Sequence, residues 1–508
     1  MALFLACGEV AQAQAPMSAI DWLSDSIAED SAINLAAPAA EQPAEQPATG
    51  GGAQAVITVT PLDDPSSDAV GLLPVSVTGL PGSLWGASSS ADLARQFAQL
   101  DADMIPALQG LLFTLLLAEL EPPTDSDPTA ALFLARIDTL LSLGAVEQAQ
   151  ALLDRAGADT AAEFRRWFDA SLLTGTEDQA CERLRGNPDL SPTLPVRIFC
   201  LARGGDWEAA LLTLETGRAL GEMTGAEDAL LTRFLDAESF EDAPPLPAPS
   251  RPTPLEFRLY EAIGEALPTA NLPLAFAHTD LGPNNGWKAQ IVAAERLARS
   301  GAIADNLLLG LYTERLPAAS GGVWDRVAAI QRFERALASR EADAISAALP
   351  EVWGEMSAIS LDAVFARLYA GALQGLDLTG TASALAFRIG LISPDYEAVA
   401  KARTPLDAEE TFLIGLARGD LAGATAAEPF AQAILDGFNA TAAPELLTKL
   451  VASDRLGAAV LSAIAMASDG ARGDLVKLTD AIALFRAVGL EDVARRTGLQ
   501  ILILDRRG

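Results

Sequence analysis

The chain has 508 residues, of which 50% are hydrophobic, and its formal net charge is −33. This composition allows a large hydrophobic core, and the length allows two or more domains. A surface this acidic repels the phosphates of nucleic acids and the headgroups of anionic lipids, so nucleic-acid binding is excluded. An acidic surface of this kind would suit a basic partner.

Residues 1–15 have the features of a signal peptide whose start is truncated. The apolar run from Ala2 to Gly8 is short, and no Lys or Arg precedes it. Small residues alternate from Ala11 to Ala15, as a signal peptidase requires. We expect cleavage near Ala13 or Ala15 and a periplasmic protein without a membrane span. A lipoprotein anchored through Cys7 and a cytosolic protein with an apolar start are the alternatives.

Residues 16–90 are expected to be extended and mostly disordered. A weak apolar patch around Trp22 is followed by a low-complexity linker, residues 36–55, that repeats Glu-Gln-Pro-Ala. Residues 56–60 alternate like a single strand, and apolar side chains between 63 and 90 are spaced to pin an extended segment to a surface. Trp22 is a candidate contact for a partner, unless its patch packs on the rest of the chain.

Helices begin near Ala91. The apolar stretch from Met104 to Leu120 is bounded by Asp101, Asp103, Glu119 and Glu121. A helix that spans a bilayer needs about 20 apolar residues. The stretch is too short, so we expect a core helix that is buried on most sides.

Residues 91–240 are predicted to form helical hairpins. Gly144, Gly175 and Gly205 lie 31 and 30 residues apart, and each ends an apolar helical run that a second helix follows. The segments 143–149 and 204–210 resemble the turn and second helix of a tetratricopeptide repeat. The resemblance implies an all-α fold, an irregular α-solenoid of hairpins. A generic helical bundle is the alternative.

Two cysteines lie within these hairpins. Cys181 and Cys200 are 19 residues apart, on successive helices. In an oxidising compartment we expect a disulfide, which would stabilise the fold by roughly 3 kcal/mol. The alternative is a pair of buried thiols. Two cysteines and the single histidine cannot complete a structural zinc site, so neither a metal nor another cofactor is expected.

Residues 241–254 contain six prolines and are predicted to be a linker, since proline this dense cannot be helical. The linker is expected to separate the first helical-repeat domain, residues 91–240, from a second one, residues 255–508. One continuous superhelix with a surface loop is the alternative. Leu-Ala-Arg followed by Gly or Ser-Gly occurs at 201, 297 and 416, and marks three helix ends. The helices expected in the second half lie around 257–267, 272–277, 287–298, 327–337, 342–349, 361–373, 382–389, 408–417, 429–438, 444–451, 456–467, 475–488 and 490–496, with 499–504 as an apolar cap.

Candidate sites are few. Gly321 and Gly322 allow close approach of a partner, and Trp324 and Arg326 are residue types enriched where proteins bind one another. The alternative is a tight turn with a buried tryptophan. His278 precedes a Gly/Asn-rich loop, but a lone histidine is more often satisfied within the fold. Phosphate-loop, dinucleotide, zinc-protease and calcium-loop patterns are absent, so no catalytic residue is predicted.

Two functions remain. The first is a non-enzymatic periplasmic scaffold or adaptor that binds another envelope protein through its helical-repeat surface. The second is an enzyme on an all-helical frame that acts on peptidoglycan or another substrate. Soluble lytic transglycosylases resemble such a frame, but their Glu-Ser signature and Gly-Leu-Met-Gln turn are missing here. A cleft with converging carboxylates of shifted pKa would favour the enzyme.

Overall fold

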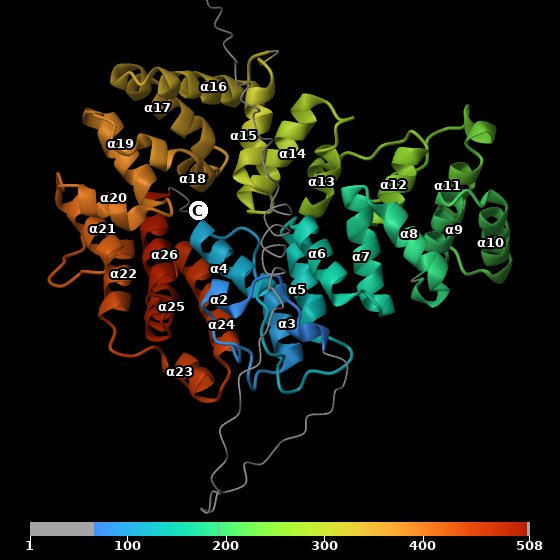
Figure 1. Cartoon of the computed structure of the whole chain (residues 1–508), viewed down its shortest axis with the longest axis horizontal. Coiled ribbons are helices and arrows are strands. Elements are labelled where there is room, and N and C mark those ends of the chain that lie inside the picture. Colours follow the sequence, from blue (N-terminus) through green and yellow to red (C-terminus); the bar gives the residue numbers. More distant parts are fainter. Residues whose placement is uncertain (1–65, 192, 318, 505–508) are drawn as a thin grey trace, which may run out of the picture. The chain divides into compact units, whose positions relative to one another are not determined.

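The computed structural model describes residues 66–191, 193–317 and 319–504 (Figure 1). Within these ranges the fold is all-helical, as predicted, and the only β pairing is an isolated parallel bridge between Leu73 and Ala118. No helix in these ranges is long and apolar enough to cross a membrane. The expected signal peptide, the Trp22 patch, the linker 36–55 and the strand 56–60 lie outside the described residues.

The helices before the proline-rich segment alternate with short turns. They are η2 (Ser67–Ala69), α2 (Val75–Thr78), α3 (Ser90–Gln99), α4 (Pro106–Leu117), α5 (Ala131–Ser142), α6 (Val146–Ala156), α7 (Ala161–Thr174), α8 (Glu177–Gly186), η3 (Pro188–Leu190), α9 (Leu194–Arg203), α10 (Trp207–Leu220), α11 (Gly225–Leu235) and η4 (Ala237–Phe240).

The second half begins with α12, whose first residue is the last proline of the dense run. The elements are α12 (Pro254–Ala262), η5 (Thr269–Asn271), η6 (Leu274–Phe276), α13 (Ala277–Asp280), α14 (Trp287–Arg299), α15 (Asp305–Glu314), α16 (Val323–Ser339), α17 (Ala342–Ser357), α18 (Asp362–Leu373), α19 (Gly380–Leu391), α20 (Tyr396–Ala402), α21 (Ala408–Arg418), α22 (Pro429–Asn439), α23 (Glu445–Ala452), α24 (Leu456–Ala471), α25 (Leu475–Ala487) and α26 (Glu491–Ile503).

The spaced glycines lie in the turns between paired helices. Gly144, Gly175 and Gly205 have φ values of 78°, 78° and 83°, in the left-handed region that favours glycine. A Cβ at Gly144 would also lie 2.8 Å from side-chain atoms of Leu274 and Leu297. The turns join α5 to α6, α7 to α8 and α9 to α10, and the helices of each pair pack together.

Cys181 on α8 and Cys200 on α9 lie at disulfide distance. Their Sγ atoms are 2.01 Å apart and their Cα atoms 4.9 Å apart. Both side chains are buried. The expected pairing is therefore present, and it joins the second helix of one hairpin to the first helix of the next.

The last helices pack against the first. α24 contacts α3 and α4, and α26 contacts α4. The Gln500 side chain accepts a hydrogen bond of 2.7 Å from the buried backbone N–H of Ala107, at the start of α4. One core cluster accordingly contains side chains from both ends of the described chain, from Leu80 to Ile501, whereas a second cluster is centred on α14–α19. Whether the two predicted domains fold independently stays a prediction.

A fully buried arginine anchors the segment before α3. Arg136 on α5 donates to the backbone carbonyls of Leu116, Val70 and Ala118, at 2.8–2.9 Å. The buried Asp68 carboxylate accepts from the backbone N–H of Phe133 at 2.7 Å. These bonds explain why residues 66–89 stay on the helices although they contain little helix of their own.

The helices differ from the expected ones in several places. α17 does not end at Leu349 but continues through Pro350 to Ser357, because Val352 and Met356 are buried beyond the proline. The expected apolar cap 499–504 is mostly the last part of α26. The helices α11, α15 and α20 were not predicted, and each buries only two side chains. The four-residue α2 lies within residues 16–90, which were expected to be extended, and none of its side chains is buried.

Candidate functional site

The predicted glycine–tryptophan segment forms a turn at the start of α16. Gly321 and Gly322 are exposed with φ values of 96° and 60°, and the Gly321 N–H donates to Asp325 at 3.0 Å. Trp324 is half-buried and packs on Trp287, with ring centroids 5.0 Å apart. The two glycines therefore build a tight turn.

Arg326 is occupied within the fold. Its Nε and a terminal nitrogen each donate to the Glu295 carboxylate at 2.7 Å, and the Tyr312 hydroxyl donates to the same carboxylate at 2.8 Å. Hydrogen bonding and charge from Glu295 raise the pKa of Arg326 against the opposing effect of burial. The guanidinium is thus unavailable to a partner without breaking this pair, and partner binding at Arg326, Gly321, Gly322 and Trp324 stays a prediction.

His278, the chain's single histidine, is buried on α13. Its Nε2 lies 2.6 Å from the Gly144 carbonyl oxygen in the α5–α6 turn. Burial lowers the pKa of His278, while the Gly144 carbonyl and Glu147 oppose that shift. A neutral imidazole that donates to a turn carbonyl is a structural element of the fold.

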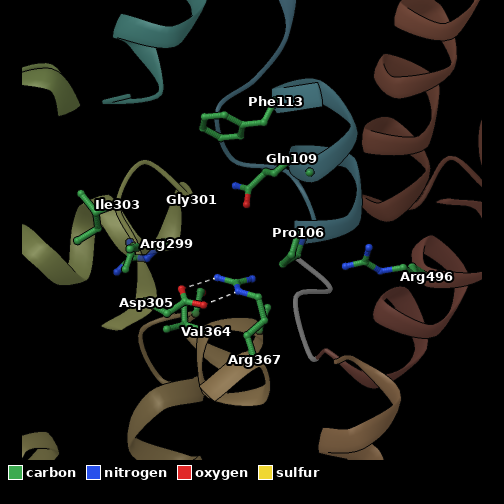
Figure 2. Close-up of a pocket in the computed structure, with 15 residues that line it drawn as sticks. Pro106, Gln109, Phe113, Arg299, Gly301, Ile303, Asp305, Val364, Arg367 and Arg496 are labelled. Carbon is green, nitrogen blue, oxygen red and sulfur yellow. Dashed lines mark hydrogen bonds and ion pairs between the residues drawn. The ribbon is translucent and has the colours of Figure 1, made fainter. Parts of the chain in front are cut away.

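An arginine-lined pocket lies where four distant parts of the chain meet (Figure 2). It has a volume of about 360 Å³ and is lined by the first half of α4, the α14–α15 turn, the start of α18 and one residue of α26. Its charged residues are Arg299, Arg367, Arg496 and Asp305. Three cations and one anion therefore converge locally in a chain of net charge −33.

The one carboxylate in the pocket is already engaged. Arg367 donates two hydrogen bonds to Asp305, at 2.6 and 2.8 Å, as the dashed lines in Figure 2 show. This parallel pair uses the planar fork of the guanidinium. Arg299 has no hydrogen-bond or ion-pair partner within the described ranges. Arg496 only approaches the exposed Asp492, at 3.7 Å, and its buried Nε has no partner among the described atoms.

Gln500 and Arg496 lie one turn apart on the same face of α26. The Gln500–Ala107 hydrogen bond holds that face against the first turn of α4. Figure 2 shows Arg496 directed from α26 toward Pro106, with the Gln109 amide directed into the same space from α4. Phe113, Ile303 and Val364 supply apolar walls.

A smaller cavity of about 290 Å³ contains the carboxylate with the most raised pKa. Burial raises the pKa of Asp169 to about 6, and the charges of Arg165 and Arg166 oppose that shift. Glu227 and Glu256 line the same cavity, but each caps the start of its own helix in a capping box. Among the carboxylates that line this cavity, Asp169 is therefore the one that does not cap a helix.

The outer face of α10 carries a group of exposed apolar side chains. α10 packs on α9 and α11 (Figure 1) through Ala210, Leu214 and Gly217. On the rest of the helix circumference, the exposed fractions are 50% for Trp207, 51% for Leu211, 68% for Leu212 and 65% for Leu220. We call this surface the α10 face. At about 100° per residue, these four side chains are spread over more than half of the circumference of α10, and Glu208 and Glu215 lie between Leu211 and Leu212. Grouped exposed apolar side chains mark interaction sites more often than single residues do.

The α10 face is acidic as well as apolar. The segment 206–222 contains Asp206, Glu208, Glu215 and Glu222, all exposed, and Arg218 as its one cation. Arg218 is paired with Glu215 and Asp228 at 2.6 Å each. The uncompensated charge around the exposed leucines is therefore negative.

No group of three or more His, Cys, Asp or Glu residues that could hold a metal occurs among the residues with a described position. Comparison of the chain with protein-family models, curated proteins and solved structures gives no match.

Sequence reasoning missed both the arginine pocket and the α10 face. The motif that marks helix ends at 201, 297 and 416 contains Arg203, Arg299 and Arg418. The structure confirms that each of the three lies in the last turn of a helix. Arg203 pairs with Asp178 at 2.7 Å, whereas Arg299 lines the pocket without a partner among the described residues. The motif predicts a helix end equally well in both cases, so it could not reveal the pocket.

Proposed function

We propose that this protein is a non-enzymatic periplasmic adaptor, an irregular α-solenoid of tetratricopeptide-like hairpins that binds another envelope protein. Successive packed hairpins with glycine turns support the solenoid part of the proposal. The cysteine pair at disulfide distance is compatible with an oxidising compartment. The observation that carries the binding part is the α10 face.

The chemistry of the α10 face specifies its partner. Exposed leucines with a tryptophan favour the apolar stripe of an amphipathic helix. The surrounding carboxylates favour Lys and Arg on the flanks of that helix. The occupant is therefore a basic amphipathic helix of a second protein. Acidic surfaces steer such partners by long-range attraction, and the apolar contacts then supply the specificity.

The test uses a labelled helical peptide with leucines at a helical spacing and lysines elsewhere, with fluorescence anisotropy as the readout. We expect the full chain to bind it. The double variant Leu211→Gln/Leu212→Gln should bind the peptide at least about tenfold more weakly. Each leucine that becomes buried on binding contributes roughly 1.5 kcal/mol or more.

The matched control is Leu446→Gln on α23, since Leu446 is 71% exposed and lies outside the α10 face. It should leave the affinity unchanged. Equal affinity of the double variant and the control would mean that the peptide binds by charge alone, and the adaptor surface would be wrong. If the double variant binds the peptide more weakly than the control does, photo-crosslinking from position 212 in the periplasm would identify the natural partner.

Asp169 favours a second candidate function, an enzyme that uses a carboxylic acid near neutral pH. A carboxyl group with pKa about 6 in a cavity has the acidity of a general acid. The test is turnover of peptidoglycan fragments by the wild type and by Asp169→Asn. Turnover that the substitution abolishes, while the urea unfolding midpoint does not fall, would replace the adaptor proposal. No turnover by the wild type would exclude this candidate for peptidoglycan.

A further inference from the structure

We propose that the arginine-lined pocket is a binding site for a small organic carboxylate with a short apolar body. The inference is independent of the α10 face, because none of the residues that line the pocket belongs to α10.

The lining of the pocket has unused hydrogen-bonding capacity. A guanidinium has five N–H donors, and a buried one left without an acceptor costs free energy. Arg496 Nε is buried without a described partner, and the nearest described carboxylate, that of Asp492, lies 3.7 Å from its terminal nitrogen. Arg299, which has no partner within the described ranges, is exposed at the edge of the same pocket. An oxyanion at Arg496 would satisfy a donor that the fold leaves open, and Arg299 adds positive charge at the opposite edge of the pocket (Figure 2).

The lining of the pocket also carries a local positive charge. Asp305 neutralises Arg367, so the remaining formal charge of the lining is that of Arg299 and Arg496. The start of α4, with Pro106 as its first residue, adds the positive end of a helix dipole. The excess of acidic residues elsewhere repels anions in general, so only a site with clustered arginines can retain one.

The shape of the pocket suits a small carboxylate. Asp305 shows that a planar carboxylate fits the fork of an arginine in this pocket. The walls supplied by Phe113, Ile303 and Val364 are apolar and suit a short hydrocarbon body. A volume of about 360 Å³ lies at the lower end of the usual range for small-molecule pockets. Inorganic phosphate would match the charge but would leave these walls uncovered.

The experiment is isothermal titration calorimetry of the full chain with hexanoate at low salt. Hexanamide has the same body without the charge, and inorganic phosphate has the charge without the body. N-acetyl-leucine carries its carboxylate as the C-terminal residue of a peptide would. We expect hexanoate or N-acetyl-leucine to bind, hexanamide and phosphate to bind at least about tenfold more weakly, and added NaCl to weaken binding.

The deciding variant is Arg299→Gln/Arg496→Gln, which leaves the Arg367–Asp305 pair intact. It should weaken hexanoate binding at least about tenfold. Arg418→Gln is the matched control, because Arg418 lies in the same helix-end motif as Arg299 but outside the pocket. An unchanged urea midpoint shows that the double variant is folded; if it does not fold, Arg299→Gln alone, which removes an exposed side chain, takes its place.

The outcomes separate clearly. Binding by N-acetyl-leucine but not hexanoate assigns the pocket to a peptide C-terminus, and the reverse assigns it to a free acid. The proposal is wrong if neither carboxylate binds at millimolar concentration, if hexanamide binds as well as hexanoate, or if the arginine variant binds like the Arg418→Gln control. None of these results changes the expected affinity of the α10 face for its basic peptide.

Discussion

At the scale of single residues, the most consequential side chain is Arg136. It is fully buried, and it holds the carbonyl oxygens of Val70, Leu116 and Ala118. Burial lowers the pKa of Arg136 to about 10, with Asp68 opposing that shift, so the group is still charged at pH 7. Its contribution is to satisfy backbone acceptors that no water reaches.

We expect Arg136→Met to lower the free energy of unfolding by about 3–5 kcal/mol, because it leaves three carbonyls and the buried Asp68 uncompensated. The measurement is urea unfolding followed by circular dichroism. The control is Arg335→Met, which removes an exposed arginine from α16 and should change stability by less than about 0.5 kcal/mol. A loss no larger than in the control would contradict the anchoring role of Arg136.

The single histidine gives a pH prediction that can be assigned to one group. Burial lowers the pKa of folded His278 below the unfolded value of about 6.5. Between the folded and the unfolded pKa, the unfolded chain therefore binds more protons than the folded chain. The free energy of unfolding accordingly falls as pH drops below about 6.5. Above that pH the contribution is fully present.

The comparison is the unfolding free energy of the wild type and His278→Gln between pH 8 and pH 5. A glutamine keeps a donor for the Gly144 carbonyl but does not titrate. The wild type should lose stability relative to the variant on acidification. Parallel curves, or an imidazole NMR titration with its midpoint above about 6.5, would show that the histidine is not held neutral.

At the scale of elements, the Cys181–Cys200 pair joins α8 to α9 across a separation of 19 residues. We expect Cys181→Ala/Cys200→Ala to reduce the free energy of unfolding by roughly 3 kcal/mol in the chain-entropy model. Thermal unfolding with and without a reductant is the measurement. The reduced wild type should resemble the double variant, and an effect of the reductant on the double variant itself would assign the loss to another cause.

Helical periodicity located most elements because their buried stripes are long. Leu132, Ile137 and Leu140 repeat on one face of α5, and all three are fully buried. α11 was missed because only Leu230 and Leu231 are buried on it. Interactions between distant residues leave no such pattern. Nothing in the sequence near Arg136 distinguishes a buried arginine from an exposed one, since its partners are carbonyl groups common to every residue.

The candidate sites show the same limit. Arg299, Arg367 and Arg496 lie on separate helices, and only the packing of α14, α18 and α26 around α4 brings them to one pocket. By contrast, Gly321 and Gly322 could be located from local sequence, and their turn follows from their positive φ values. Local backbone geometry is encoded locally, whereas a pocket between distant helices is a property of the tertiary fold.

At the scale of the whole described structure, the contact between the last and first helices determines whether these regions unfold together. α24 and α26 share a core with α3 and α4, and the Gln500–Ala107 hydrogen bond is buried between them. Segments that share a core and a buried polar contact are expected to open as one cooperative unit. Side chains of α9–α11 belong to the same extended core cluster, but within the described residues these helices pack mainly on α8 and α12 and have no strong contact with α24–α26, so they should open separately.

Gln500→Leu removes the acceptor for the buried Ala107 N–H, and we expect it to cost about 1–3 kcal/mol. Native-state hydrogen exchange should then accelerate in α3 and α4 as well as in α26, but not in α9–α11. Gln432→Leu is the control, because Gln432 bonds only to Asp436 on its own exposed face of α22. Acceleration confined to α26 would mean that the two ends of the chain are packed together but open independently. The same variant could also bind hexanoate more weakly, because Gln500 holds α26, the helix that carries Arg496, against α4. Joint acceleration together with weaker hexanoate binding would connect the pocket to the contact between the last and first helices.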